Sequence, residues 1–200
     1  MKTTQLFLCL VLALPATHAQ QHTYNFDKKI ALPGDGGYDY LSIDEANNKL
    51  YVSHGTTVNV IDLATEKPVA VISDMKGVHG IAIANDLDRG YISDGRANAV
   101  IAFDLKTFQK IATIPVSGNG PDGIMYDAFS KQVFCFNGES KNASVIDAVG
   151  LKQVGTVDLG GGPEFAVPNG SGIVYNNIED KNSLAVIDAK TMKVIRSYPL

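Results

Sequence analysis

The chain has 200 residues, of which 45% are hydrophobic and 19% are charged, and its formal net charge is −4. This composition excludes an intrinsically disordered chain, because disorder needs low hydrophobicity and high net charge. A slightly acidic chain without runs of Lys and Arg argues against nucleic acid as a partner, and no segment reaches the roughly 18 apolar residues of a membrane-spanning helix.

The first 19 residues have the composition of a secretory signal peptide. Lys2 supplies positive charge, and residues 6–14 (LFLCLVLAL) form a short apolar run. Thr17 and Ala19 then place small residues at the −3 and −1 positions of a cleavage site. We therefore expect cleavage near Ala19, a mature domain over residues 20–200, and a periplasmic or secreted location.

A short segment before the repeats resembles a strand. Residues 28–34 (KKIALPG) match residues 110–116 (KIATIPV), which lie at the end of a later repeat. A single N-terminal strand that matches the fourth strand of the repeats typically closes a ring by completing the last blade. We therefore expect residues 28–34 to be a closing strand. Its partner strands are not in this sequence, which predicts a truncated ring with two or three further blades beyond Leu200. A closed four-bladed ring is the alternative, but it leaves residues 28–34 without a partner.

From residue 38 onward the chain repeats itself. Residues 51–63 (YVSHGTTVNVIDL) and 91–105 (YISDGRANAVIAFDL) have closely similar sequences. Periods of about 40 to 50 residues are typical of propeller blades or of paired-helix arrays. Val and Ile alternate with small or polar residues in short runs, which predicts strands and excludes helical repeats. An aspartate ends an apolar run in every period, at spacings of 42, 43 and 41 residues: Asp62, Asp104, Asp147 and Asp188.

Each period divides into four predicted strands. In the second period these are residues 80–84, 90–94, 98–104 and 110–116, and the first of them is rich in Gly and Ala, as an innermost strand near an axis requires. The prediction is an all-β chain, a β-propeller of four-stranded antiparallel blades. The blades are expected at about residues 38–77, 78–120, 121–162 and 163–200.

The repeats resemble the YVTN-type repeat of the YncE-like bacterial propeller family, which is WD40-like in architecture. The resemblance covers residues 28–200, although the second-strand signature has drifted to YVSH, YISD, FCFN and YNNI. It implies an exported protein, commonly of seven blades, and we expect a monomer. It also implies binding of an undefined ligand. One branch of the family is associated with nucleic acid, which the acidic balance of this chain does not support.

Aligning the repeats brings four residues into register just before the innermost strand of each blade: Asp39, His79, Asp122 and Glu164. A second set stands at the end of the second strand: His54, Asp94 and Asn137. In a propeller both loops open on one face around the central channel, so these residues are candidate ligand-binding residues at the channel mouth. The strand pattern stays constant between blades while the residue types at these positions change. This variation favours a ligand-binding role over a purely structural turn.

Carboxylates and imidazoles at one axis could bind a cation, calcium if oxygen ligands dominate and zinc if histidine joins them. They could also hold a polar small molecule. Turn chemistry is the structural alternative, since such side chains often bond to backbone amides before a strand. We interpret the chain as an exported binding or interaction module for a small molecule or a protein. The rival interpretations are a metal-dependent hydrolase of the lactonase kind, which would use the same carboxylates, and a structural or adhesion protein of the cell surface.

Overall fold

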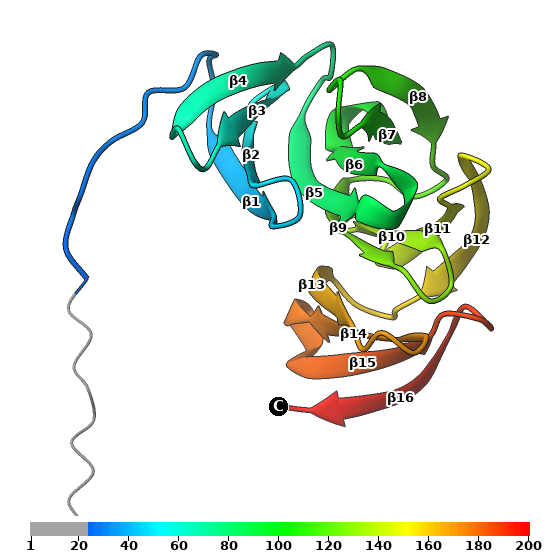
Figure 1. Cartoon of the computed structure of the whole chain (residues 1–200). Helices are drawn as coiled ribbons and strands as arrows, with labels where there is room; N and C mark the ends of the chain where they lie inside the picture. Colours follow the sequence, from blue (N-terminus) through cyan, green and yellow to red (C-terminus); the bar gives the residue numbers. More distant parts are fainter. Residues whose placement is uncertain (1–23) are drawn as a thin grey trace, which may run out of the picture.

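Four separate antiparallel sheets form an arc around a common centre in the computed structural model, which describes residues 24–200 (Figure 1). Each sheet uses four strands that are consecutive in the chain, in the order β1-β2-β3-β4 and its equivalents. We call the sheets blades 1 to 4. The all-β propeller prediction is confirmed, whereas the signal peptide predicted over residues 1–19 lies outside the described residues.

The strands agree with the predicted ones to within a few residues, and three short 3₁₀ turns connect some of them. The strands are β1 Tyr38–Asp44, β2 Lys49–His54, β3 Thr57–Asp62, β4 Lys67–Ile72, β5 Val78–Ala84, β6 Arg89–Asp94, β7 Ala99–Asp104, β8 Lys110–Pro115, β9 Pro121–Asp127, β10 Gln132–Asn137, β11 Asn142–Asp147, β12 Lys152–Asp158, β13 Pro163–Pro168, β14 Ile173–Ile178, β15 Ser183–Asp188 and β16 Lys193–Pro199. The turns are η1 Asn85–Leu87, η2 Gly95–Ala97 and η3 Glu179–Lys181.

The repeated aspartate ends the third strand of each blade by fixing the turn that follows. In blade 2 the Asp104 carboxylate accepts hydrogen bonds from the Thr107 backbone N–H at 2.7 Å and from its hydroxyl at 2.9 Å. Asp188 makes the same pair with Thr191 at 2.7 Å and 3.0 Å. An acidic side chain that bonds to the backbone three residues on stops a strand and sets a turn. The period of the aspartates is therefore structural.

The innermost strands β1, β5, β9 and β13 line the centre of the arc and contact one another in that order. Glycine permits this approach. A β-carbon at Gly80 would lie 2.8 Å from the Ile124 side chain and 3.0 Å from the carbonyl oxygen of Asp122, and one at Gly123 would collide with the carbonyl oxygen of Glu164. The Gly-rich character of the predicted innermost strand thus has a steric cause.

Three hydrophobic cores hold neighbouring blades face to face. Between blades 1 and 2 the rings of Tyr51 and Phe103 lie 5.6 Å apart, centroid to centroid, and both side chains are fully buried. Between blades 2 and 3 the Tyr91 hydroxyl donates to the Ala148 carbonyl at 2.6 Å, which satisfies its polar end. Phe134 is fully buried in the core between blades 3 and 4. Burial of aromatic and branched side chains between sheets fixes the angle at which blades meet.

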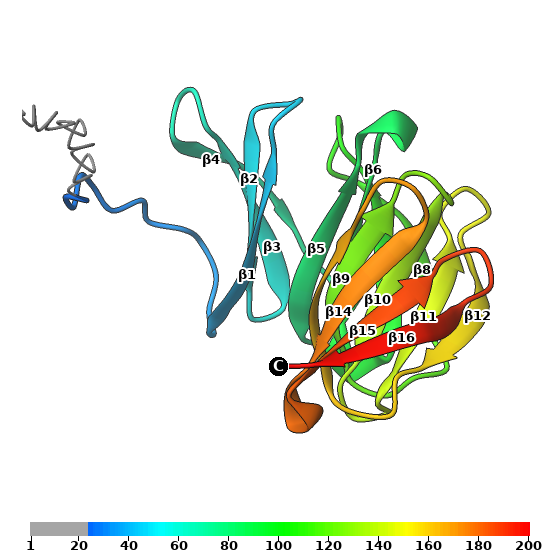
Figure 2. The same ribbon diagram turned by 90° about the horizontal axis from the view of Figure 1, so that it is seen from below.

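Residues 28–34, predicted to pair with strands beyond Leu200, have no strand partner among the described residues. This segment makes no ladder in the described structure and lies outside blade 1 (Figure 2). Pro33 lacks an N–H donor, and Gly34 has a φ of +116°, which takes the chain out of the extended conformation. All four strands of blade 4 come from residues 163–199. Within the described part of the chain, no helix has the length and apolar character needed to cross a membrane.

Candidate functional site

A bulge at the start of each innermost strand sets the direction of the candidate ligand-binding side chains. In β5, His79 and Gly80 together oppose the single residue Ser93 of β6, because Val78 pairs with Asp94 and Ile81 with Ile92. The other blades show the same irregularity, and it contains Asp39 in β1, Asp122 in β9 and Glu164 in β13. Bulges re-aim side chains and are common next to binding sites.

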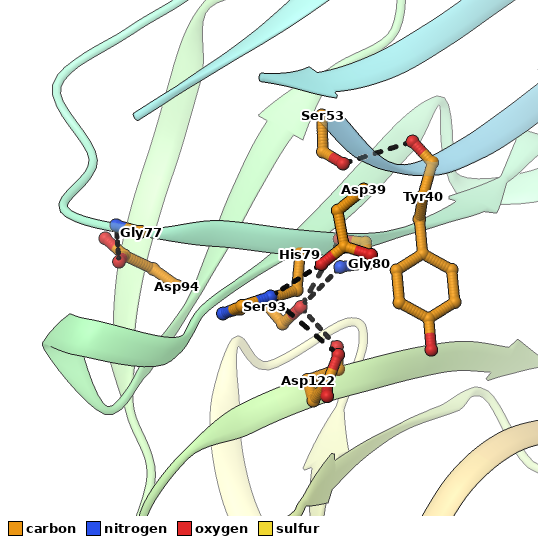
Figure 3. Close-up of polar contacts among 9 residues, drawn as sticks. All are labelled: Asp39, Tyr40, Ser53, Gly77, His79, Gly80, Ser93, Asp94 and Asp122. Atoms are coloured by element: carbon orange, nitrogen blue, oxygen red, sulfur yellow. Dashed lines mark hydrogen bonds and ion pairs between the residues drawn. The ribbon is translucent and has the colours of Figure 1, made fainter. Parts of the chain in front are cut away.

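Three of the predicted residues converge at the channel mouth. His79 Nδ1 lies 2.7 Å from Asp39 Oδ2 and 3.9 Å from Asp122 Oδ1. The ligand atoms of the three side chains all lie within 4.8 Å of one another, and Figure 3 shows the side chains directed toward a common point. Each comes from a different blade, so the contact spans blades 1, 2 and 3. We call Asp39, His79 and Asp122 the channel-mouth cluster.

The backbone around His79 is shaped for its imidazole ring. A β-carbon at Gly95 would lie 2.8 Å from His79 Nε2 and 2.9 Å from its Cδ2, so glycine provides the space that the ring fills. The Ser93 hydroxyl accepts the Gly80 backbone N–H at 2.8 Å and donates to the Asp122 carbonyl. This one hydroxyl links the bulge of blade 2 to the bulge of blade 3. It therefore fixes the separation between His79 and Asp122.

Burial and like charges at the mouth raise the pKa values of neighbouring acids. Burial raises the pKa of the Asp122 carboxyl, and the Asp39 charge adds to this, whereas His79 acts in the opposite direction. Burial, and then the charges of Asp122, Glu164 and Asp39, raise the pKa of Tyr40 to about 12. A cation at this position would relieve that repulsion.

Glu164 occupies the equivalent position in blade 4 but is not a member of the cluster. It lies near enough to feel it, because burial and then the charges of Asp122 and Glu179 raise the pKa of the Glu164 carboxyl. Its neighbour Phe165 faces Tyr40, with ring centroids 6.5 Å apart and planes inclined by 13°. Glu164 therefore adds negative charge to the mouth, but it does not belong to the group of side chains whose ligand atoms could hold one ion together with His79.

The second predicted set lies inside the blades and is held by backbone or neighbouring side chains. Asp94 is 2% exposed and accepts hydrogen bonds from the backbone N–H groups of Lys76 at 3.0 Å and Gly77 at 2.9 Å. Figure 3 shows it turned away from the cluster. The fully buried Asn137 donates to the Asn142 side chain at 2.8 Å and to a serine hydroxyl at 3.0 Å. These two residues organise loops.

His54, the third member of that set, is also buried, at 4% exposure. Its ring nitrogens lie 3.3 Å and 3.2 Å from the carbonyl oxygens of Pro33 and Gly36. The Tyr38 ring stacks on it with centroids 4.3 Å apart. His54 thus fastens the segment that leads into blade 1, and the structure does not bring it to the channel-mouth cluster.

Two grooves run from the cluster between the blades. The first, of about 560 Å³, lies between blades 1 and 2 and includes Asp39, His79 and Asp35 in its lining. The second, of about 360 Å³, lies between blades 2 and 3 and includes His79, Asp122 and Glu139. Arg96 lines both grooves. The cluster is therefore open to ligands from two sides.

Sequence reasoning missed Ser93 and Gly95, which position the cluster. A signal for the serine was present, since YVSH and YISD share it and Ser53 also bonds to the innermost strand, donating to the Tyr40 carbonyl at 3.1 Å. Gly95 gave no such signal, because Gly55 and Gly138 occupy similar places after the second strand without a histidine against them. Only the three-dimensional contact distinguishes it.

Comparisons with known proteins support the fold. No known family model matches the chain. Antigen Lp49 of Leptospira interrogans serogroup Icterohaemorrhagiae serovar copenhageni is 33% identical over 106 residues, which are 52% of this chain and 22% of the antigen. The chain therefore spans about a fifth of that relative's length.

Several solved structures are similar in fold. Hydrazine synthase of Kuenenia stuttgartiensis superposes with a TM-score of 0.74 at 17% identity, over 88% of this chain and 53% of that chain. The β-propeller domain of Myceliophteria thermophila Cps50 (Swd1) gives 0.70 at 15% identity, over 84% and 57%. The dihydro-heme d1 dehydrogenase NirN, in complex with DHE, gives 0.65 at 16% identity, over 81% and 37%. Identities this low show the fold alone, and the fold is a β-propeller.

Proposed function

We propose that this chain is an exported propeller module that holds a divalent metal ion at its channel mouth and presents it to a small-molecule or protein ligand. The observation that carries the proposal is that the ligand atoms of Asp39, His79 and Asp122 lie within 4.8 Å of one another. Export rests on the composition of the first 19 residues, and assignment to YVTN-type repeats rests on the period and the second-strand letters.

The donor set suits a first-row transition ion. Two carboxylate oxygens and one imidazole nitrogen are typical ligands of zinc, which takes nitrogen and oxygen at about 2.0–2.2 Å. Calcium requires about six to eight oxygen ligands and gains little from an imidazole. The donor separations of 2.7 Å and 3.9 Å bracket what ligands of one ion require, so small side-chain rotations suffice. Three protein ligands also leave coordination positions open.

Electrostatics supports the same proposal. Within residues 24–200, Asp39 and Asp122 have only His79 as an ion-pair partner, and Glu164 has none. Burial first, and then the charges of neighbouring carboxylates, raise the pKa values of Asp122 and Glu164, which reflects the cost of ionising these groups here without a counter-charge. A divalent ion would supply that counter-charge, and carboxylates retained at such a cost are typical of functional sites.

Isothermal titration of the metal-free protein with Zn²⁺ and Ca²⁺ tests the proposal. We expect one Zn²⁺ per chain, weaker Ca²⁺ binding, and a loss of at least about tenfold in Zn²⁺ affinity for Asp39→Asn and for Asp122→Asn. Asp88→Asn is the matched control, because Asp88 pairs with Lys106 far from the cluster and its φ of +51° suits asparagine. Zn²⁺ binding that is equal in all four proteins, or absent from the unmodified one, would refute the metal site.

A further inference from the structure

We infer that the ligand presented to the metal is a small carboxylate, held by the ion at one oxygen and by the Arg96 guanidinium at the other. This inference rests on the metal site proposed above and adds the class of ligand and the residue that selects it.

Arg96 stands beside the cluster on the turn η2, directly after Gly95, the glycine on which the His79 ring lies. Its aliphatic stem crosses Gly77, where an added β-carbon would lie 2.9 Å from Arg96 Cγ and 3.0 Å from its Cδ. The side chain is therefore carried over the ridge between the two grooves. It lines both of them together with His79.

The grooves lead to the open side of the cluster. Asp39 and His79 line the first groove, and His79 and Asp122 line the second, so a metal bound by the three would be reached from both. A ligand atom entering either groove meets the open coordination positions of the ion and the guanidinium of Arg96 together. The planar fork of arginine matches the two oxygens of a carboxylate.

The proposed metal ion and Arg96 would offer positive charge to an anion at this place, and the nearby acidic side chains limit the charge of that anion. Arg96 is the only Lys or Arg in the described lining of either groove, and within residues 24–200 its guanidinium makes neither an ion pair nor a hydrogen bond. A divalent ion offsets Asp39 and Asp122, which leaves Arg96 as an available positive charge. Asp35 and Glu139 remain in the grooves and repel a dianion more strongly than a monoanion, so the ligand class is a carboxylate rather than a phosphate.

Cobalt substitution gives a direct readout, because the visible absorption of Co²⁺ changes when a ligand enters its coordination sphere. The Co²⁺-loaded protein is titrated with glycolate and, separately, with inorganic phosphate. We expect a saturable spectral change with glycolate, at concentrations at which phosphate has little effect. Arg96→Gln should weaken glycolate binding by about tenfold, the effect of losing a charge-assisted hydrogen bond. Arg196→Gln is the matched control, since Arg196 lies on β16, where it donates to the Tyr198 hydroxyl at 2.8 Å.

The outcomes separate this inference from the metal site. Equal glycolate affinity in Arg96→Gln and Arg196→Gln, with Co²⁺ bound in both, overturns the role of Arg96 and leaves the metal site standing. Tighter binding of phosphate than of glycolate overturns the ligand class. An unmodified protein that takes up no Co²⁺ removes the metal site, and this inference with it.

Discussion

The α-carbon of Gly123 in β9 stands directly against the backbone carbonyl of Glu164 in β13, with no room for a side chain between them. Gly123 and Glu164 belong to the innermost strands of neighbouring blades, so this contact sets how closely blades 3 and 4 approach. Because the contact is between the backbones of the two strands, no flexible side chain can move aside to make room for a larger residue at position 123.

Gly123→Ala should therefore destabilise the protein by about 1–3 kcal/mol, the usual cost of overpacking a close contact. Gly138→Ala is the matched control, since nothing lies within 4 Å of its β-carbon position. It should be neutral or slightly stabilising, because alanine lowers the entropy of the unfolded chain. Urea unfolding measures both, and equal midpoints for the two variants would contradict the steric account.

Asp122→Asn should raise the stability of the metal-free protein at neutral pH. Burial, with the charge of Asp39, raises the Asp122 pKa, so the native state holds this proton more tightly than the unfolded chain does. Unfolding then releases a proton, and stability falls as pH rises through the raised pKa. We expect a gain of about 2 °C in melting temperature at neutral pH, kept small by solvent screening.

The gain should disappear below the usual Asp pKa of 3.8, where the carboxyl is protonated in both states. Thermal melts recorded across this range in the presence of a chelator check both halves of the prediction. A gain that is the same at every pH would mean that the ionised carboxylate is not its cause. With metal present the order should reverse, since only the carboxylate stabilises the bound ion.

Asp94→Ala should behave in the opposite way to a change in the channel-mouth cluster. Its carboxylate accepts the N–H groups of Lys76 and Gly77, which would be left without a protein partner. We expect a loss of about 2 kcal/mol in unfolding free energy together with retained metal stoichiometry. Denaturant unfolding and Zn²⁺ titration of the same preparation test this. Loss of metal with unchanged stability would place Asp94 in the site instead.

Asp62→Asn should remove part of the acid sensitivity of the fold. Hydrogen bonds from Lys49 and from Thr65 lower the Asp62 pKa from 3.8 to about 2. The carboxylate therefore contributes stability above pH 3.8 that is lost as pH falls toward about 2. Melting temperatures of the unmodified protein should fall through this window more steeply than those of the variant. Parallel curves would show that the turn does not depend on the charge.

Much of this architecture could be predicted from the amino-acid sequence alone. The spacing of Asp62, Asp104, Asp147 and Asp188 specifies the blade period, because each aspartate is tied to its own turn. Alternating Val and Ile specify the strands. These features are local, since the atoms that decide them lie within a few residues of one another.

The site was predictable only in part. The register argument grouped Asp39, His79, Asp122 and Glu164, because equivalent positions of a radial repeat must lie at similar heights around the axis, and the ligand atoms of the first three do lie close together. The same argument also placed His54 and Asp94 at the channel mouth. The bulge, however, turns the first-strand residues toward the channel, whereas the second-strand residues stay inside the blade. A bulge depends on the pairing of two strands and is not marked by a characteristic residue type in either strand. Residues 28–34 show the converse case, a strand-like sequence that makes no ladder.

The division of the channel-mouth cluster among three blades has a consequence for the order of folding. Within each blade every strand pairs with its neighbour in sequence, so a single blade closes only short loops and can form early. Asp39 and His79, by contrast, are forty residues apart and meet only after blades have docked. During refolding, high-affinity uptake of the metal ion proposed for this cluster would therefore begin when the third blade is in place, and the ion would then slow the separation of the blades that it joins.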